Sequence, residues 1–206
     1  MQIRYATDLS VEEYVRQEAW KEAKLDHCPL HPEGGCGFFK HGTYERKYPE
    51  GTKVARWYCK MGHTTFGLLP DCLCSRLRGS LNEVETVMLK VEHSPSQEDA
   101  VEDLRIDIAL PGILRWVRRR IYLVRSALVM VIALMPSLFS QCNPTISAFR
   151  STLLVEPILE ELRSCASPHL HLLPPPLGFG PRPEPKKNKK RHFQHQTGTD
   201  PPLWKL

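Results

Sequence analysis

From Ser80 onwards, apolar residues recur at every third or fourth position, which is the spacing of one face of an α-helix. The pattern predicts three helices, which are expected over residues 81–91, over 95–104 and from 111 onwards. The second begins in a capping box, Ser94 to Gln97, with Pro95 at its first helical position. Three helices whose last two are joined by a short turn predict a helix-turn-helix over residues 80–126.

The third predicted helix has two faces of opposite chemistry. At 100° per residue, apolar side chains share one face and basic side chains share the other. The apolar face holds Ile113, Val117, Ile121, Val124 and Leu128, and the opposite face holds Arg115, Arg118, Arg119 and Tyr122. Arginine binds phosphates and can donate two hydrogen bonds to guanine, so this face suits the major groove of DNA. The alternative is a solvated face whose arginines pair with the eight carboxylates of residues 80–109.

An apolar run, residues 127–135, follows this helix. It is shorter than the roughly 20 residues that a membrane span needs, so it predicts a buried core helix. Membrane association is the alternative, because the arginines before the run resemble a positive flank. Asn143-Pro144 and Pro157 are expected to start further helices. Residues 127–166 are therefore predicted to be C-terminal helices, whose apolar residues between 127 and 162 are a candidate surface for a protein partner.

The two ends of the chain differ in composition. Residues 1–27 predict a helix that starts at a capping box, Ser10 with Glu13, and their acidic residues are the wrong sign for a targeting segment. Residues 167–206 are rich in proline and then in lysine, with little material for a core, so we expect a disordered tail. The basic cluster at 186–191 could attract phosphates.

Residues 38–58 predict a β-hairpin. Aromatic residues lead to a turn at Pro49-Glu-Gly51, and residues 52–58 alternate as a returning strand. The hairpin is basic, and Arg46, Lys47 and Arg56 are candidate phosphate contacts. The alternative is a solvated strand face.

Five potential metal ligands flank the hairpin, with Cys28, His31 and Cys36 before it and Cys59 and His63 at its end. Thiolate plus imidazole suits zinc, and the lack of a carboxylate or an open position indicates a structural site. Only four can bind one tetrahedral ion: Cys59 with His63, and Cys28 with either Cys36 or His31. Cys36 is favoured because a thiolate is the stronger donor and the glycine after it permits a tight turn. The alternative is a set of unrelated buried cysteines and exposed histidines.

Three stretches carry a resemblance to a known family: His41-Gly-Thr-Tyr-Glu-Arg46, Arg56-Trp-Tyr-Cys59 and Thr65-Phe-Gly-Leu-Leu-Pro70. In this order they resemble the zinc-ribbon module at the N-terminus of bacterial insertion-sequence transposases and their small uncharacterised relatives. That family has Cys-x2-Cys at both knuckles, whereas here the first is interrupted and the second ends in His63. The resemblance implies a zinc ribbon over 28–79 and DNA recognition. A transposase also needs a ribonuclease-H-like catalytic domain, for which the residues after the third helix leave no room.

The remaining composition narrows the class of protein. The odd number of cysteines, seven, without a secretory signal, indicates a reducing compartment, and we expect the cytoplasm. Cys72 and Cys74 have no nearby partners and are expected to be buried as small hydrophobic residues. No phosphate-binding loop, nucleophile elbow or zinc-protease motif occurs, so we expect neither an enzyme nor a small-molecule substrate.

The expected fold class is mostly α with a small β zinc ribbon, followed by a helix-turn-helix, additional C-terminal helices and a disordered tail. The expected function is zinc-dependent DNA binding by a transposase-like recognition module that lacks the catalytic part. One alternative is a zinc-stabilised scaffold that binds a protein through the helices of 127–162, and another is a degenerate transposase remnant.

Overall fold

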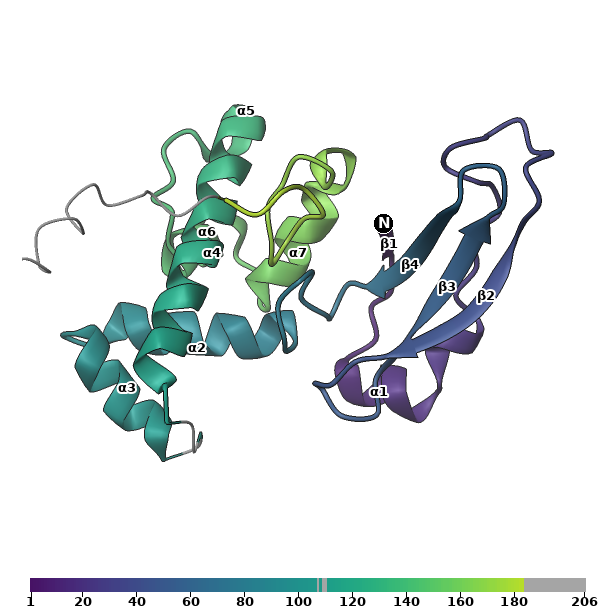
Figure 1. Cartoon of the computed structure of the whole chain (residues 1–206). Helices are drawn as coiled ribbons and strands as arrows, with labels where there is room; N and C mark the ends of the chain where they lie inside the picture. Colours follow the sequence, from purple (N-terminus) through teal and green to yellow (C-terminus); the bar gives the residue numbers. More distant parts are fainter. Residues whose placement is uncertain (107, 109–110, 184–206) are drawn as a thin grey trace, which may run out of the picture.

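A four-stranded mixed sheet forms the N-terminal part of the chain (Figure 1). The computed structural model describes residues 1–106, 108 and 111–183. The strands are β1 (Gln2–Tyr5), β2 (Phe38–Glu45), β3 (Lys53–Cys59) and β4 (Thr64–Pro70), in the spatial order β1-β4-β3-β2. β2 and β3 pair antiparallel, which confirms the hairpin, and β3 and β4 also pair antiparallel. β1 lies parallel to β4 at the edge of the sheet.

A short helical segment covers one face of this sheet. It consists of α1 (Val11–Arg16) and the 3-10 helix η1 (Ala19–Lys21), and the predicted capping box of Ser10 and Glu13 is present. Tyr14 and Trp20 are buried against Ala55 and Leu68 of the sheet. Because β1 also belongs to the sheet, residues 1–27 are not the separate helix that the sequence predicted.

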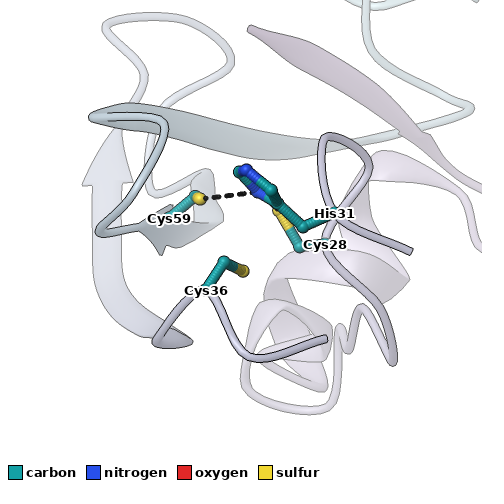
Figure 2. Close-up of side chains that lie close together, drawn as sticks. All are labelled: Cys28, His31, Cys36 and Cys59. Atoms are coloured by element: carbon teal, nitrogen blue, oxygen red, sulfur yellow. Dashed lines mark hydrogen bonds between the residues drawn. The ribbon is translucent and has the colours of Figure 1, made fainter. Parts of the chain in front are cut away.

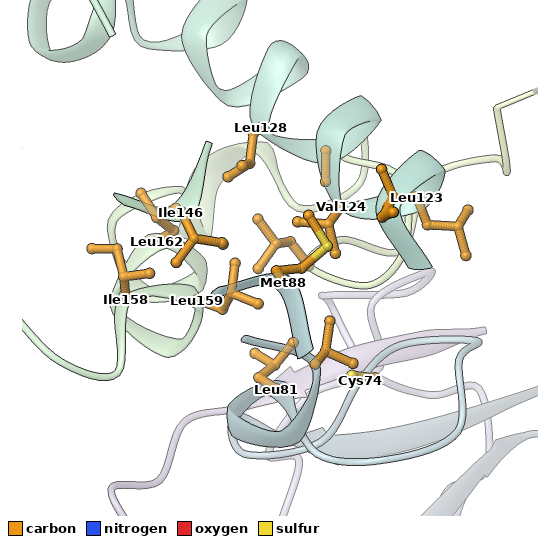
Figure 3. Packing of buried hydrophobic residues seen from close by; sticks show 14 of the residues in the cluster. Cys74, Leu81, Met88, Leu123, Val124, Leu128, Ile146, Ile158, Leu159 and Leu162 are labelled. Carbon is orange, nitrogen blue, oxygen red and sulfur yellow. The ribbon is translucent and has the colours of Figure 1, made fainter. Parts of the chain in front are cut away.

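The C-terminal part is a helical unit built around α4. Its helices are α2 (Leu81–His93), α3 (Gln97–Arg105), α4 (Ile113–Leu134), α5 (Pro136–Phe139), α6 (Ile146–Leu153), α7 (Ile158–Cys165) and the 3-10 helix η2 (Ser167–His169). Figure 3 shows side chains of α2, α4 and α7 meeting in its core, among them Met88, Val124 and Leu159. The apolar face predicted for the third helix is buried. Within the described part of the chain, no helix is long and apolar enough to span a membrane.

Two predicted boundaries in this unit are wrong. α4 continues without a break from Ile113 to Leu134, so the helix-turn-helix does not end at residue 126, and 127–135 is the second half of the same helix. The connection between α3 and α4 spans residues 106–112, which is longer than the turn of three or four residues typical of that motif. α3 begins at Gln97 and is capped by the Ser96 side chain.

The first part of the predicted tail is folded. Leu170, Leu173 and Leu177 are buried in the helical core, so residues 167–183 are part of the fold. The buried Arg163 fixes this segment, since its Nε donates to the Leu177 carbonyl at 2.9 Å and its Nη2 to the Pro176 carbonyl at 2.7 Å. The rest of the predicted tail, 184–206 with its basic cluster, lies outside the described residues.

The described part of the chain combines a helical unit with a smaller mixed sheet. The described ranges contain seven α-helices and one four-stranded mixed sheet with a Cys/His cluster, so the combination of a small β part with helices is confirmed. The predicted fold class of mostly α is not confirmed, because the sheet has four strands and is more extensive than the predicted hairpin.

Candidate metal centre

Three cysteines and one histidine lie close together at the end of the sheet where β2 begins and β3 ends (Figure 2). Cys28 and His31 come from the loop after η1, Cys36 lies just before β2, and Cys59 is the last residue of β3. Their three sulfurs and one ring nitrogen all lie within 4.8 Å of one another. His31 Nδ1 is 3.6 Å from Cys28 Sγ and 3.4 Å from Cys59 Sγ.

Tight turns at both knuckles bring the ligands together. Cys28 and His31 face each other in an isolated bridge, and the His31 amide donates to the Cys28 carbonyl at 3.1 Å. At the second knuckle the Gly62 amide donates to Cys59 Sγ at 3.2 Å. A Cβ at Gly62 would come within 2.7 Å of Leu30 Cδ1, so glycine permits this close turn. A peptide N–H pointing at a sulfur stabilises the thiolate form that a metal requires.

Burial and mutual contact set the ionisation of the three thiols. All three cysteines are nearly inaccessible, with at most 3% of their surface exposed. Burial opposes ionisation of Cys28, but hydrogen bonds from the His31 ring and the Leu30 amide outweigh it and lower the pKa of Cys28 to about 6. Burial and hydrogen bonds to Cys28 and Cys59 raise the pKa of Cys36 to about 11. Adjacent thiols therefore resist ionising together, and a bound cation would remove that conflict.

The donor set fits a structural metal site. Three thiolates and one imidazole complete a tetrahedral shell with no carboxylate among the four and no position left for a substrate. The cluster lies against the sheet core next to Phe66, and the partly buried Phe38 and Trp57 pack on it. A metal ion here would tie the loop after η1 to the starting end of β2 and the final end of β3.

The structure places His31, and not His63, with the three cysteines. His63 is exposed, has a φ of +44° and lies 3.3 Å from the Tyr58 hydroxyl through Nδ1. The turn that directs the Gly62 amide to Cys59 carries His63 away from the cluster. The predicted ligand set of Cys28, Cys36, Cys59 and His63 is therefore wrong in its last member, which is replaced by His31. The signal for His31 was its spacing, because Cys28-x2-His31 is the usual knuckle spacing and Cys59-x3-His63 is not.

The α4 residues proposed for DNA binding lie on its solvent-exposed face. Arg115 and Arg119 are exposed, and Tyr122 has 39% of its surface exposed. Arg118 is also exposed, and its guanidinium bonds Glu98 of α3 at 3.0 Å. One upstream carboxylate is therefore paired with an arginine of this face, as in the alternative interpretation.

The basic residues of the hairpin separate into different roles. Arg46 donates to the carbonyls of Cys74 at 3.0 Å and Leu77 at 2.7 Å, so its guanidinium holds the connection between the sheet and α2. Because these guanidinium N–H groups already bind backbone carbonyls, the structure argues against the predicted phosphate contact of Arg46. Lys47 is exposed, and Arg56 is partly buried on the sheet.

Arg120 of α4 is buried, which the sequence pattern did not predict. The Arg120 guanidinium stacks 3.4 Å from the centre of the Trp116 ring and donates to the Arg78 carbonyl at 3.1 Å. Burial lowers the pKa of Arg120 to about 10. The only available signal was its place in the helix, between the apolar positions 117 and 124.

Comparisons of this chain with protein-family models, curated proteins and solved structures found no match in any of the three. The resemblance to the transposase zinc-ribbon module therefore remains a prediction from the sequence.

Proposed function

We propose that this protein binds duplex DNA through the exposed face of α4. We also propose that a zinc ion bound by Cys28, His31, Cys36 and Cys59 stabilises the N-terminal sheet. The observation that carries the proposal is the arginine face of α4. Arg115, Arg119 and Arg125 are exposed there, and none of them has an ion-pair partner among the residues that the structure describes. The helix holds five arginines and no carboxylate.

A helix of this kind has two uses for its arginines. Guanidinium groups attract the phosphate backbone regardless of sequence, and those that reach the groove can donate to guanine. The Arg118–Glu98 pair does not remove Arg118 from this set, because an exposed ion pair contributes only about 0–1 kcal/mol and can be exchanged for a phosphate. The carboxylates of α3 would instead repel DNA and limit the directions from which it can approach α4.

Zinc is the metal that best suits the donor set. It accepts thiolate and imidazole ligands in tetrahedral geometry, and a closed four-ligand shell is typical of structural sites. The role of the metal is then to hold the loop and the sheet together, because so small a sheet has little core of its own.

The proposal can be tested with a double variant, Arg115→Ala with Arg119→Ala, in a duplex-binding titration at several salt concentrations. Each lost phosphate contact should lower the slope of log affinity against log salt by about one. The matched control is Arg16→Ala with Lys24→Ala, which removes the same charge from exposed positions near the sheet. Loss in the first variant and not in the second is expected, whereas an equal response of both would mean that only net charge matters.

A second candidate function has one observation in its favour. Val129 and Met130 of α4 and Leu172 are exposed, and they line a groove together with Tyr122 and Arg125. An exposed apolar groove is a common site for a protein partner. If the double variant bound duplex DNA as tightly as the parent over the whole salt range, this scaffold function would replace DNA binding.

A further inference from the structure

The sheet has an uncovered area near the metal centre. Side chains alternate between the faces of a strand, and paired residues share a face. Ala55 and Trp57 pack with α1 and η1, so Arg56 and Tyr58 lie on the other face of β3. Phe39 of β2 is paired with Tyr58 and therefore shares that face.

Three aromatic rings meet on this open face. The ring centre of Tyr58 lies 5.8 Å from that of Phe39 and 5.5 Å from that of His41, and Phe39 and His41 are 5.9 Å apart. Phe39 and His41 are exposed, and Tyr58 is partly exposed. The His41 and Tyr58 planes differ by 38°, whereas the Phe39 ring is edge-on to both, at 83° to His41 and 74° to Tyr58. We call these three residues the aromatic platform.

The platform is bordered by positive charge. Lys60 Nζ lies 5.7 Å from the centre of the Phe39 ring. The register passes from Lys40↔Trp57 to Thr43↔Ala55, so His41 and Gly42 lie opposite Arg56. Arg56 Nε is buried and has no hydrogen-bond partner within the described residues. Arg56 therefore shares the face of the platform, next to Tyr58 in the pattern of alternation along β3, and is partly exposed there.

Negative charge is absent from this face of the three long strands. The only carboxylate in β2, β3 and β4 is Glu45, which is paired with Lys53. Lys53 Nζ lies over the Trp20 ring of η1, so this pair belongs to the covered face. The platform therefore combines aromatic surface with positive charge, which is complementary to bases and phosphates.

The platform lies next to the candidate metal ligands in the sequence. Cys59 directly follows Tyr58 in β3, and Cys36 lies three residues before Phe39. A metal bound by both cysteines fixes the two strand ends that carry the rings. A bound metal would thus restrict the movement of the rings relative to one another.

We propose that Phe39, His41 and Tyr58 form a stacking platform for unpaired bases of single-stranded DNA, and that Arg56 and Lys60 bind the phosphates of that strand. Single strands are required because the faces of bases in a duplex are covered by their neighbours. This surface is separate from α4, so the inference goes beyond the duplex binding proposed above. Only the choice of DNA over RNA rests on that proposed function.

The test is a binding titration of the full chain, loaded with zinc, against a fluorescent oligodeoxythymidine of about 12 nucleotides, a length within the usual site size. Phe39→Leu and Tyr58→Leu should each weaken binding by about fivefold to a hundredfold, because base–aromatic stacking is lost. Phe39→Tyr and Tyr58→Trp should retain binding, since both keep an aromatic face. Met61→Ala is the matched control, because Met61 is 66% exposed on the adjacent turn and is not part of the platform.

Further arms separate this site from α4 and from general charge effects. Arg115→Ala with Arg119→Ala should weaken duplex binding and leave oligodeoxythymidine binding unchanged, and Phe39→Leu should do the reverse. Oligouridine of equal length binding as tightly as oligodeoxythymidine would overturn the assignment to DNA, and equal competition by duplex would overturn the stacking site.

A measurement on the unsubstituted protein guards against variants that fail to fold. Ultraviolet crosslinking to oligodeoxythymidine, followed by peptide mass spectrometry, should place crosslinks within residues 39–41 or 56–60. Crosslinks confined to α4, or leucine variants that keep both their zinc and their full affinity, would show that the platform does not bind single strands.

Discussion

The fully buried Glu85 of α2 forms an ion pair with Arg150 of α6, whose side chain is 25% exposed. The Arg150 guanidinium donates to one Glu85 oxygen at 2.9 Å and 2.6 Å, and the Glu85 side chain is 0% exposed. The same carboxylate accepts the amides of Ile158 at 3.0 Å and Leu159 at 2.9 Å, at the start of α7. Glu85 thus satisfies unpaired amides of one helix while it neutralises a cation of another.

Replacing Glu85 should therefore destabilise the whole helical unit. We expect Glu85→Gln to lower the free energy of unfolding by about 1–3 kcal/mol, the usual cost of leaving buried donors without their acceptor, because Arg150 is partly exposed and keeps its pair with Glu156. Thermal and urea unfolding would measure the loss. Glu98→Gln is the control, because it removes a carboxylate from the exposed Arg118–Glu98 pair and should change stability by less than about 1 kcal/mol. A similar small effect at Glu85 would contradict a structural role for the pair.

The ligand set predicts which substitutions release the metal. His31→Ala and Cys36→Ser should each lose most of the bound zinc and loosen the sheet, because binding and folding are coupled at such sites. His63→Ala should keep one zinc per chain, since His63 is exposed and contacts Tyr58 instead. Elemental analysis of the purified variants decides the question. Full zinc in His31→Ala together with loss in His63→Ala would restore the set predicted from sequence.

Arg46 and Lys47 are neighbours with different expected effects. Arg46→Ala should lower stability by about 1.5–3 kcal/mol, because a charged donor of two backbone carbonyls is removed. Lys47→Ala, at an exposed position, should leave stability unchanged within about 0.5 kcal/mol. Unfolding curves give both values. If Arg46→Ala lowered DNA affinity but left stability at the parental value, Arg46 would be a phosphate contact, as the sequence predicted.

Thiol labelling at pH 8 should separate the seven cysteines into groups. Burial raises the pKa of Cys72 and of Cys74 to about 12, so at this pH only about 1 in 10⁴ of either thiol is ionised and both should remain unlabelled in folded protein. Cys142 and Cys165 are both partly exposed, and Cys142 should react first, because burial and the hydrogen bond to Glu161 raise the pKa of Cys165. Cys28, Cys36 and Cys59 should become reactive only after a chelator is added. Peptide mass spectrometry identifies the labelled sites, and early labelling of Cys74 would argue against its burial.

Local patterns in the sequence determined much of the local structure. The capping box at Ser10, the β2–β3 hairpin and the apolar face of α4 follow from residues close together in the chain, and each is present. The burial of Cys72 and Cys74 was also predicted, from their apolar character and their lack of nearby partners. These features depend on helical or strand periodicity and on hydrogen bonds over a few residues, which a sequence displays directly.

Only the tertiary structure decided how distant residues are used. Three of the four predicted ligands are in the cluster, but whether His31 or His63 completes it depends on the direction of a turn, which the spacing alone did not settle. Arg46 and Arg163 bind carbonyls that lie far away in sequence, so their burial could not be read from their neighbours. Residues 167–183 were predicted to be a tail because their few leucines have no periodic pattern, yet Leu170, Leu173 and Leu177 are buried in the core of the helical unit. Such choices depend on which backbone groups and cavities other segments leave unsatisfied, and that is fixed only when the whole chain is folded.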